Sequence, residues 1–234
     1  MSIEAPGHGW LPELTGDARV DRWREHRAAV RAELVEATLR AIEEFGPELS
    51  IDDVVKTAGV PRPKLYRFFD DKDTLFSAVG ERVQDMVLER VVPRFHTAGT
   101  TLELVRSAVA TYIDLVDERP NLFRFLVGAQ FTERRSTEAL LEGGRPLANA
   151  ICDFVATVLQ ERGGQSDNLQ YVVDALLGAV ALGVLRWLNE PAISKPTLVE
   201  QLTTFVWAAL SATAAARGVV LDPDEQVQSP ASID

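Results

Sequence analysis

Apolar residues recur at helical spacing through nearly the whole chain, and this pattern constrains the fold more than any other feature. Val30, Leu34, Ala37, Ala41 and Phe45 follow one another at steps of 4, 3, 4 and 4 residues, which places them on one face of a helix. There is no sustained alternation of apolar and polar residues, and no Asn-Gly or Asp-Gly pair marks a hairpin turn. The sequence therefore predicts an all-α protein.

Proline and glycine divide the rest of the chain into further helices. After the first helix ends at Gly46, the predicted helices cover residues 51–58, 62–69, 73–92, 100–118, 121–131, 146–162, 167–189 and 197–217. Asp70, together with Asp73, is expected to cap the long helix that ends before Pro93. The residues from Asp222 onward are polar and are expected to form a flexible tail.

The chain lacks the signals that mark several other classes of protein. Cys152 is the single cysteine, so no intramolecular disulfide forms, and a reducing cytoplasm is the expected location. The three histidines lie far apart, so the sequence predicts neither a metal site nor a cofactor. The most apolar run, residues 175–185, is shorter than the roughly 20 residues that span a membrane, and predicts a buried helix with no membrane contact.

The net charge of −11 is unevenly distributed along the chain. Residues 19–72 contain eleven basic and eleven acidic side chains, whereas residues 73–234 contain 13 basic and 21 acidic ones. The acidic excess therefore belongs mainly to the C-terminal two-thirds. Any contact with nucleic acid must rely on local placement of charge within the balanced segment.

The most informative motif, residues 50–69, consists of two short helices that meet at a glycine. Ser50 and Asp53 have the spacing of a capping box, and Gly59 allows a tight turn between the helices. Val60 and Leu65 are apolar, so the second helix docks on the first through them. The outward face of the second helix carries three basic side chains: Arg62, Lys64 and Arg67. This arrangement predicts a helix-turn-helix whose second helix enters the major groove of double-stranded DNA.

With its flanking residues, the motif resembles the DNA-binding domain of the TetR family of bacterial regulators. The resemblance covers residues 27–87 and rests on Ser50-Ile51, Ala58-Gly59-Val60, Leu65-Tyr66, Phe69, Lys72 and Leu75-Phe76. It implies a three-helix DNA-binding domain followed by a larger helical domain for ligand binding and dimerisation. The chain then divides into an N-terminal extension or arm (1–26), the DNA-binding domain (27–87), the regulatory and dimerisation domain (88–221) and the tail (222–234).

The family's roles are carried over onto the positions that match. Ser50, Tyr66 and Lys72 match residues that meet the phosphate backbone, whereas Arg62 and Lys64 fall at the variable positions that read base edges. Arg62 is the best candidate for a base contact, because arginine binds guanine with two hydrogen bonds. The family also implies a homodimer that binds a palindromic operator as a repressor until a ligand releases it.

Two prolines depart from the family pattern. Pro61 stands where the family usually has Ser or Thr, so the side-chain cap is lost. Pro63 disfavours helical geometry at the residue before it, and the recognition helix is therefore expected to begin at Pro63, with Arg62 flanking it.

Upstream of the motif, three arginines share one helical face: Arg24, Arg27 and Arg31. One interpretation is an extended first helix or arm, in which Arg24 and Arg27 touch phosphate or the minor groove. The other is a solvated face that pairs with Asp21, Glu25 and Glu33. Both interpretations stay open at the level of the sequence.

The C-terminal domain is expected to pair with a second copy through its last two helices. Residues 169–188 are apolar nearly all round, and a helix of this kind must be covered on every side. The predicted dimer interface takes residues from both helices: Val173, Leu177, Val180, Val184, Leu202, Phe205, Val206 and Ala209.

Aromatic residues in the central helices predict a pocket for a small hydrophobic effector, such as an acyl chain or an aromatic compound. The residues expected to line it are Tyr112, Phe123, Gln130, Asn149, Phe154 and Trp187. The alternative is that these aromatic side chains only fill the core.

Two other classes of function compete with a regulator. The sequence contains no Gly-x-Ser-x-Gly, His-Glu-x-x-His or phosphate-binding Gly-Lys-Ser/Thr motif, so an enzyme is disfavoured. A helical adaptor that binds protein is distinguished by experiment, because it would have no salt-sensitive affinity for DNA.

Overall fold

The computed structural model describes residues 17–97, 99–132 and 137–227, with the side chains of residues 17–19, 127–132 and 137–144 outside that description. Its elements in chain order are α1 (Asp17–Phe45), α2 (Ile51–Ala58), α3 (Arg62–Leu65), α4 (Lys72–Val91), the 3₁₀ helix η1 (Val92–His96), β1 (Gly99–Thr100), α5 (Thr101–Glu118), α6 (Pro120–Thr132), α7 (Thr137–Glu161), α8 (Gln170–Asn189), α9 (Lys195–Ala215) and β2 (Gln226–Val227). The predicted all-α class is confirmed.

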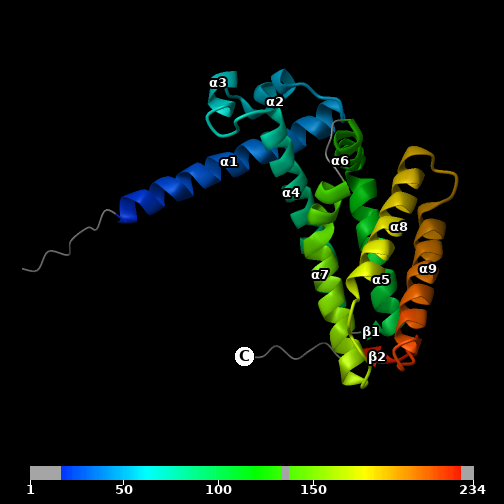
Figure 1. Ribbon diagram of the computed structural model, residues 1–234. Coiled ribbons are helices and arrows are strands. Elements are labelled where there is room, and N and C mark those ends of the chain that lie inside the picture. Colours follow the sequence, from blue (N-terminus) through cyan, green and yellow to red (C-terminus); the bar gives the residue numbers. More distant parts are fainter. Residues whose placement is uncertain (1–16, 98, 133–136, 228–234) are drawn as a thin grey trace, which may run out of the picture.

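The first three helices form a small head, and α4 connects it to the helical body (Figure 1). In the head, α1 packs on both α2 and α4. The buried side chains there include Leu34, Val54, Leu65 and Phe69, which belong to one apolar core that continues into the body. In the body, α5 packs against α4 and α9, and α7 packs against α4 and α8. Helix α4 therefore belongs to both parts of the molecule.

Local sequence signals set the geometry of the head. The hydroxyl of Ser50 accepts a hydrogen bond from the backbone N–H of Asp53 at 3.3 Å, and the Asp53 carboxylate accepts one from the Ser50 N–H at 2.8 Å. This reciprocal capping box starts α2 as predicted. Gly59 ends α2 in the left-handed region at φ +64°, which reverses the chain toward α3.

Several helix boundaries differ from the prediction. Helix α1 begins at Asp17, so residues 17–26 continue the first helix. The recognition helix α3 begins at Arg62, not at Pro63, because Pro61 is extended and Pro63 fits within the first helical turn. The helix ends at Leu65 and a turn follows from Tyr66, whereas the predicted helix continued to residue 69. The cap of α4 is Asp71, whose carboxylate accepts a hydrogen bond from the N–H of Thr74 at 2.7 Å.

The C-terminal segment differs most from expectation. Residues 222–227, here called the C-terminal strap, return to the start of α5 where a flexible tail was expected. The strands β1 and β2 pair antiparallel, with Gly99 opposite Val227 and Thr100 opposite Gln226. The backbone N–H groups of Thr101 and Leu102 donate to the carbonyls of Glu225 and Pro223 at 3.0 and 3.2 Å. These pairings are long-range, so local patterning did not reveal them.

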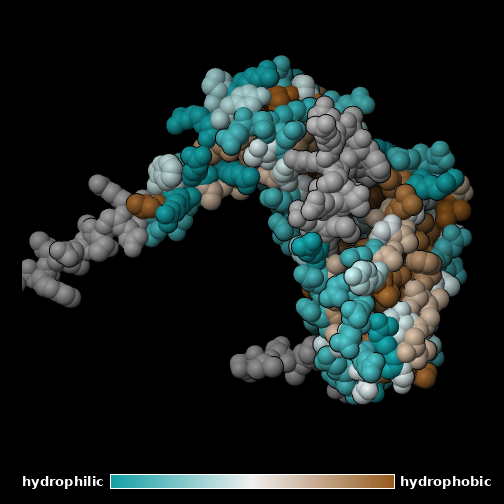
Figure 2. All heavy atoms as spheres, in the orientation of Figure 1, coloured by the Kyte–Doolittle hydropathy of each residue, from teal (hydrophilic) through white to brown (hydrophobic). Residues whose placement is uncertain are grey.

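Helix α8 is not buried on all sides. Among the described residues it is the one helix long and apolar enough, by length and composition, to cross a membrane. One face packs inward through Val173 and Val184, whereas Tyr171 and Leu182 on the other face are 80% and 68% exposed. A single chain therefore covers only one face of α8, and the expected cover of the other face by a second copy stays a prediction. Figure 2 shows apolar atoms gathered at the surface over α8 and α9.

Candidate nucleic-acid interface and internal cavity

Helix α3 presents a polar face to solvent because a single side chain anchors it. Leu65 is fully buried against the core of the head. The side chains around it that were predicted to bind DNA are exposed: Arg62, Lys64, Tyr66 and Arg67. The arrangement matches a recognition helix whose inner face packs on α2 and whose outer face is free to enter a groove.

Arg62 has two neighbours on this surface. One of its terminal nitrogens lies 3.3 Å from Oδ1 of Asp52, and its guanidinium lies 5.8 Å from the ring centre of Tyr66. Both partners of the ion pair are exposed, and exposed pairs contribute only about 0.2–1 kcal/mol. Arg62 is therefore held near the surface by a weak interaction that a base edge or a phosphate would replace at little cost.

Arg24 and Arg27 have different surroundings. Arg27 donates a hydrogen bond to the carbonyl of Arg67 at 3.3 Å, and its guanidinium lies 5.6 and 5.5 Å from the ring centres of Trp23 and Phe68. It therefore connects α1 to the turn that follows α3. Arg24 is exposed and lies 3.8 Å from Asp21, as in the solvated-face interpretation.

Ser50 and Lys72 each lie at a helix N-terminus. The Ser50 hydroxyl also donates to the Asp53 carboxylate at 2.7 Å, and these hydrogen bonds from Ser50 hold the pKa of Asp53 below its ordinary value. Lys72 is the first residue of α4, and its ammonium lies 4.9 Å from the ring centre of Phe76. An exposed lysine at a helix N-terminus is a favourable setting for a phosphate.

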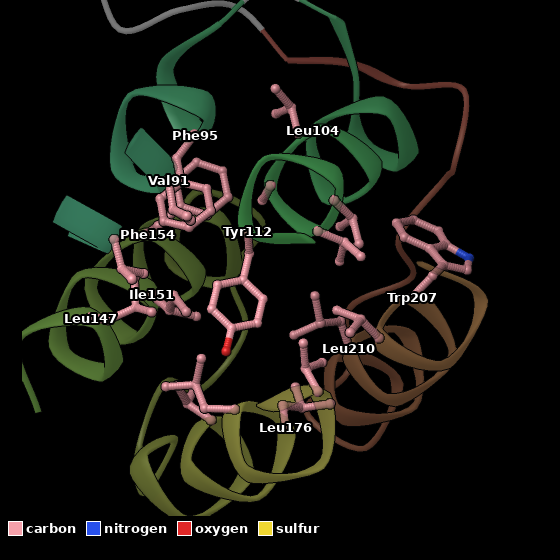
Figure 3. A pocket seen from close by; sticks show the side chains of 18 of the residues that line it. Val91, Phe95, Leu104, Tyr112, Leu147, Ile151, Phe154, Leu176, Trp207 and Leu210 are labelled. Atoms are coloured by element: carbon pink, nitrogen blue, oxygen red, sulfur yellow. The ribbon is translucent and has the colours of Figure 1, made fainter. Parts of the chain in front are cut away.

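The body contains a cavity of about 790 Å³, which is lined by residues of α4, η1, α5, α6, α7, α8, α9 and the strap. Its walls are mainly apolar, and Figure 3 shows side chains from η1, α5, α7, α8 and α9 converging on it. Three of the predicted residues line it: Tyr112, Phe123 and Phe154. Phe154 stacks on Phe95 with ring centres 5.2 Å apart, and Tyr112 meets Phe123 edge to face at 6.0 Å.

Tyr112 provides a polar group in this apolar space. Its hydroxyl points away from α5 into the cavity (Figure 3), and no described side chain forms a hydrogen bond with it. Burial raises the pKa of Tyr112 to about 12, so the hydroxyl stays protonated at neutral pH. It is available as a hydrogen-bond donor to a ligand.

Two of the predicted pocket residues lie elsewhere. Asn149 is exposed because it lies on the opposite face of α7 from Leu147 and Ile151, which line the cavity. Trp187 is not a lining residue, and its ring N–H donates to the carbonyl of Ile193 at 2.9 Å. The side chain of Gln130 lies outside the described residues.

The predicted dimer residues are also divided. Five of them face inward. Four line the cavity, namely Val173, Leu177, Val180 and Val206, and the fifth, Val184, is buried. Leu202 and Ala209 are partly buried, and Phe205 is 46% exposed. The large exposed apolar side chains of α8 are Tyr171 and Leu182, which the prediction omitted. A helix that is apolar all round gives no periodic signal for which side faces the core.

The structure adds cavity residues that the sequence reasoning missed, among them Gln84, Arg162 and Trp207. A signal for one wall was present: Leu147, Ile151, Phe154 and Val158 follow at steps of 4, 3 and 4, and Arg162 continues the row. No such signal exists for the strap residues Gln226 and Val227, which reach the cavity from the far end of the chain.

Two family models match this chain. The model for bacterial regulatory proteins of the tetR family matches residues 34–79, and the model for the tetracyclin repressor-like C-terminal domain matches residues 102–209. A relative from Mycobacterium tuberculosis, the uncharacterized HTH-type transcriptional regulator Rv0472c, is 28% identical over 211 residues, which are 89% of each chain. The HTH-type transcriptional activator FasR of Mycolicibacterium smegmatis is 26% identical over 164 residues, 69% of this chain and 73% of FasR.

Solved structures share the fold. A tetR-family transcriptional regulator from Streptomyces coelicolor is 24% identical with a TM-score of 0.61, over 82% of this chain and 83% of that one. The regulator FadR from Bacillus subtilis, solved in complex with stearoyl-CoA, is 16% identical with a TM-score of 0.61, over 76% of this chain and 98% of FadR. One family model covers the head and the other covers most of the body, and the chain is therefore a DNA-binding transcriptional regulator of the TetR family.

Proposed function

We propose that this regulator is a homodimeric repressor, and that a small hydrophobic ligand in the cavity releases it from a palindromic operator. The observation that carries the proposal is the path of α4. It begins at Lys72 beside the DNA-binding residues, and farther along it contributes Val83, Gln84 and Val87 to the cavity wall. A single helix thus joins the surface that meets DNA to the space that would hold a ligand.

The cavity suits an elongated apolar ligand. Its volume of about 790 Å³ falls within the range of about 300–1,000 Å³ that ligand pockets occupy, and its polar groups are few. FadR from Bacillus subtilis, which shares the fold, was solved with stearoyl-CoA. We therefore favour an acyl chain over an aromatic compound, and we infer that the cavity binds this ligand without converting it.

The ligand would act by shifting a conformational equilibrium. A ligand changes DNA affinity only if it binds the conformation that does not fit the operator more tightly than the one that does. A tilt of α4 is the proposed difference between these conformations, because it changes the separation of the two heads in a dimer. Operator binding and ligand binding would then weaken each other by the same factor.

The exposed apolar face of α8 and α9 is the proposed contact with the second copy. Tyr171, Leu182 and Phe205 are large and exposed there, and small residues such as Ala175 and Ala179 lie between them. Large exposed apolar patches mark interaction sites in soluble proteins, and two-fold pairing of one such patch covers it in both copies. The two-fold axis would place the two heads on the two halves of a palindrome.

The direction of the transcriptional effect has a second candidate. The relative FasR is described as a transcriptional activator. Transcription in vitro from the bound promoter, with and without the regulator, separates the two: a repressor lowers transcript and an activator raises it.

The proposal is tested by selecting bound sequences from a random DNA library with the purified full-length chain. We expect a palindromic site, an affinity whose logarithm falls linearly with the logarithm of salt concentration, and weaker binding when a long-chain acyl compound is added. Ala108 lines the cavity, so Ala108→Phe should leave DNA binding intact and remove the ligand effect. Selection of no specific site, or an affinity that salt does not change, would contradict the proposal and favour the adaptor.

A further inference from the structure

The cavity has one charged end. Among its described lining residues only Glu161 and Arg162 carry charge, and both lie where α7 ends. Thr101 and Gln226 add polar groups from the start of α5 and from the strap, which pass at the same end. The walls beyond are apolar except for a few groups such as Gln84 and the Tyr112 hydroxyl. A ligand that fills the cavity therefore has a polar end at α7 and an apolar remainder.

Arg162 is held in a fixed orientation at that end. One of its terminal nitrogens donates to the carbonyl of Val158 at 2.9 Å, and the other donates to Oε1 of Glu225 in the strap at 2.8 Å. Its side chain is only 25% exposed. A guanidinium has five donors and suits a planar carboxylate or a phosphate with two parallel hydrogen bonds. The hydrogen bonds to the Val158 carbonyl and to Glu225 use only part of that capacity.

Glu225 ties the strap to two helices. Its carboxylate accepts a hydrogen bond from Arg162, which follows the last residue of α7. Its backbone carbonyl accepts hydrogen bonds from the N–H of Thr101 at 3.0 Å and from the Thr101 hydroxyl at 3.2 Å. Gln226 and Val227, which follow it, form part of the cavity wall. The carboxylate of Glu225 thus lies where the strap closes the charged end of the cavity.

The cavity is long. Thr101 and Tyr112 both line it from α5, and at a rise of about 1.5 Å per residue they lie about 16 Å apart along the helix axis.

The carboxylate of Glu225 and that of an incoming ligand would compete for the one guanidinium of Arg162, and Glu161 beside Arg162 adds further negative charge. An incoming anion therefore binds Arg162 most readily if the ion pair between Arg162 and Glu225 breaks.

We propose that Arg162 receives the anionic headgroup of a long-chain amphipathic ligand, and that Glu225 of the strap occupies Arg162 until the ligand displaces it. The ligand class is an apolar chain that ends in a carboxylate or a phosphate-bearing group. This inference rests on the proposed function, in that the cavity is taken as the effector site. Exchange of one carboxylate for another changes the local charge little, so burial of the chain supplies the affinity, about fourfold for each added methylene.

The test compares three ligands with the same chain on the full-length protein: dodecanoate, dodecanol and dodecanoyl-CoA. Calorimetry should give tighter binding for an anionic ligand than for the alcohol. Arg162→Gln should weaken the anionic ligand about 10- to 100-fold, the range expected for a lost charge-assisted hydrogen bond, and should leave dodecanol unchanged. Glu225→Gln should strengthen the anionic ligand. Arg217→Gln is the matched control, because Arg217 donates to the backbone of Thr213 and Asp167 and does not line the cavity.

Hydrogen exchange provides a second readout that does not depend on DNA. The N–H groups of Thr101 and Leu102 donate to the strap, so their exchange should accelerate when dodecanoate or dodecanoyl-CoA binds, and in Glu225→Gln without ligand. Preference for dodecanoate over dodecanoyl-CoA identifies the headgroup as a carboxylate, and the reverse identifies the phosphate-bearing group.

The outcomes separate this inference from the proposed function. If the alcohol and the anions bind alike and all weaken DNA binding, or if Arg162→Gln weakens all three ligands equally, the headgroup assignment is wrong and the effector cavity stands. If none of the three ligands binds, the effector cavity fails together with the inference. Anion binding that leaves exchange at Thr101 and Leu102 unchanged would overturn the displacement of Glu225 alone.

Discussion

Gly59 determines the turn between the two DNA-binding helices, and replacing it with alanine isolates one physical effect. Its backbone is left-handed at φ +64°, and a Cβ at this position would meet no other atom within 4 Å. Gly59→Ala therefore introduces no clash, and only the conformational preference of alanine opposes the native turn. Gly80→Ala in α4 is the matched control, because a Cβ there would lie at an ordinary 3.7 Å from the Leu126 side chain in a helical backbone.

The two substitutions should change the free energy of unfolding in opposite directions. An L-residue in the left-handed region costs about 1–2 kcal/mol, so Gly59→Ala should lower the free energy of unfolding by about that amount. Glycine within a helix is about 0.5–1 kcal/mol less favourable than alanine, so Gly80→Ala should raise it. For a chain of this length, each kcal/mol corresponds to roughly 2–4 °C in Tm.

Thermal and urea unfolding of the three proteins under identical conditions provides the measurement. The reasoning would be refuted if Gly59→Ala were as stable as the wild type, or if both substitutions shifted Tm in the same direction. A loss well above 2 kcal/mol at Gly59 would mean that the turn carries contacts beyond its backbone conformation.

Three further predictions concern DNA binding, pH and assembly. Lys72→Ala should weaken binding to all sequences equally and reduce the salt slope by about 1, whereas Arg62→Ala should relax base preference at one position at a cost of about 1–3 kcal/mol, as measured by titrating matched and mismatched operators. The folded-state pKa of Asp53 is lowered by Ser50, so its stabilisation is present above the ordinary value of 3.8 and is lost as pH falls through the lowered pKa. The stability gap between wild type and Asp53→Asn should therefore narrow in acid, and a gap that stays constant down to pH 2 would contradict this. Leu182→Lys should dissociate the dimer in sedimentation experiments, whereas Val220→Lys, which replaces an exposed valine in the segment after α9, should not. If the two substitutions have the same effect on the sedimentation of the protein, the interface lies elsewhere.

The head was largely predictable from the sequence because its signals are local. The Ser50–Asp53 capping box, the glycine at the end of α2 and the buried Leu65 each act within a few residues, so spacing alone indicates them. The exact N-cap of α4 was missed, since Asp70, Asp71 and Asp73 are all suitable residues. The structure identifies Asp71 as the cap through the hydrogen bond that its carboxylate accepts from the Thr74 N–H.

The cavity was predictable only in part. Tyr112, Phe123 and Phe154 were identified because aromatic side chains in central helices tend to face inward. Trp187 was assigned on the same grounds, but its ring N–H is used by the Ile193 carbonyl in the loop after α8. Residue type indicates that a side chain prefers burial, but it does not indicate which of several apolar spaces the side chain enters.

Helical periodicity thus determined the fold class, the order of the helices and the head, whereas the tertiary structure decided which helix faces pack against one another. Val180 and Leu182 are two residues apart in a helix that is apolar all round, yet one lines the cavity and the other is exposed. Glu225 reaches Arg162 across 63 residues of chain. Spacing along a helix encodes direction only when its faces differ in polarity, and contacts between distant segments depend on packing that no local window contains.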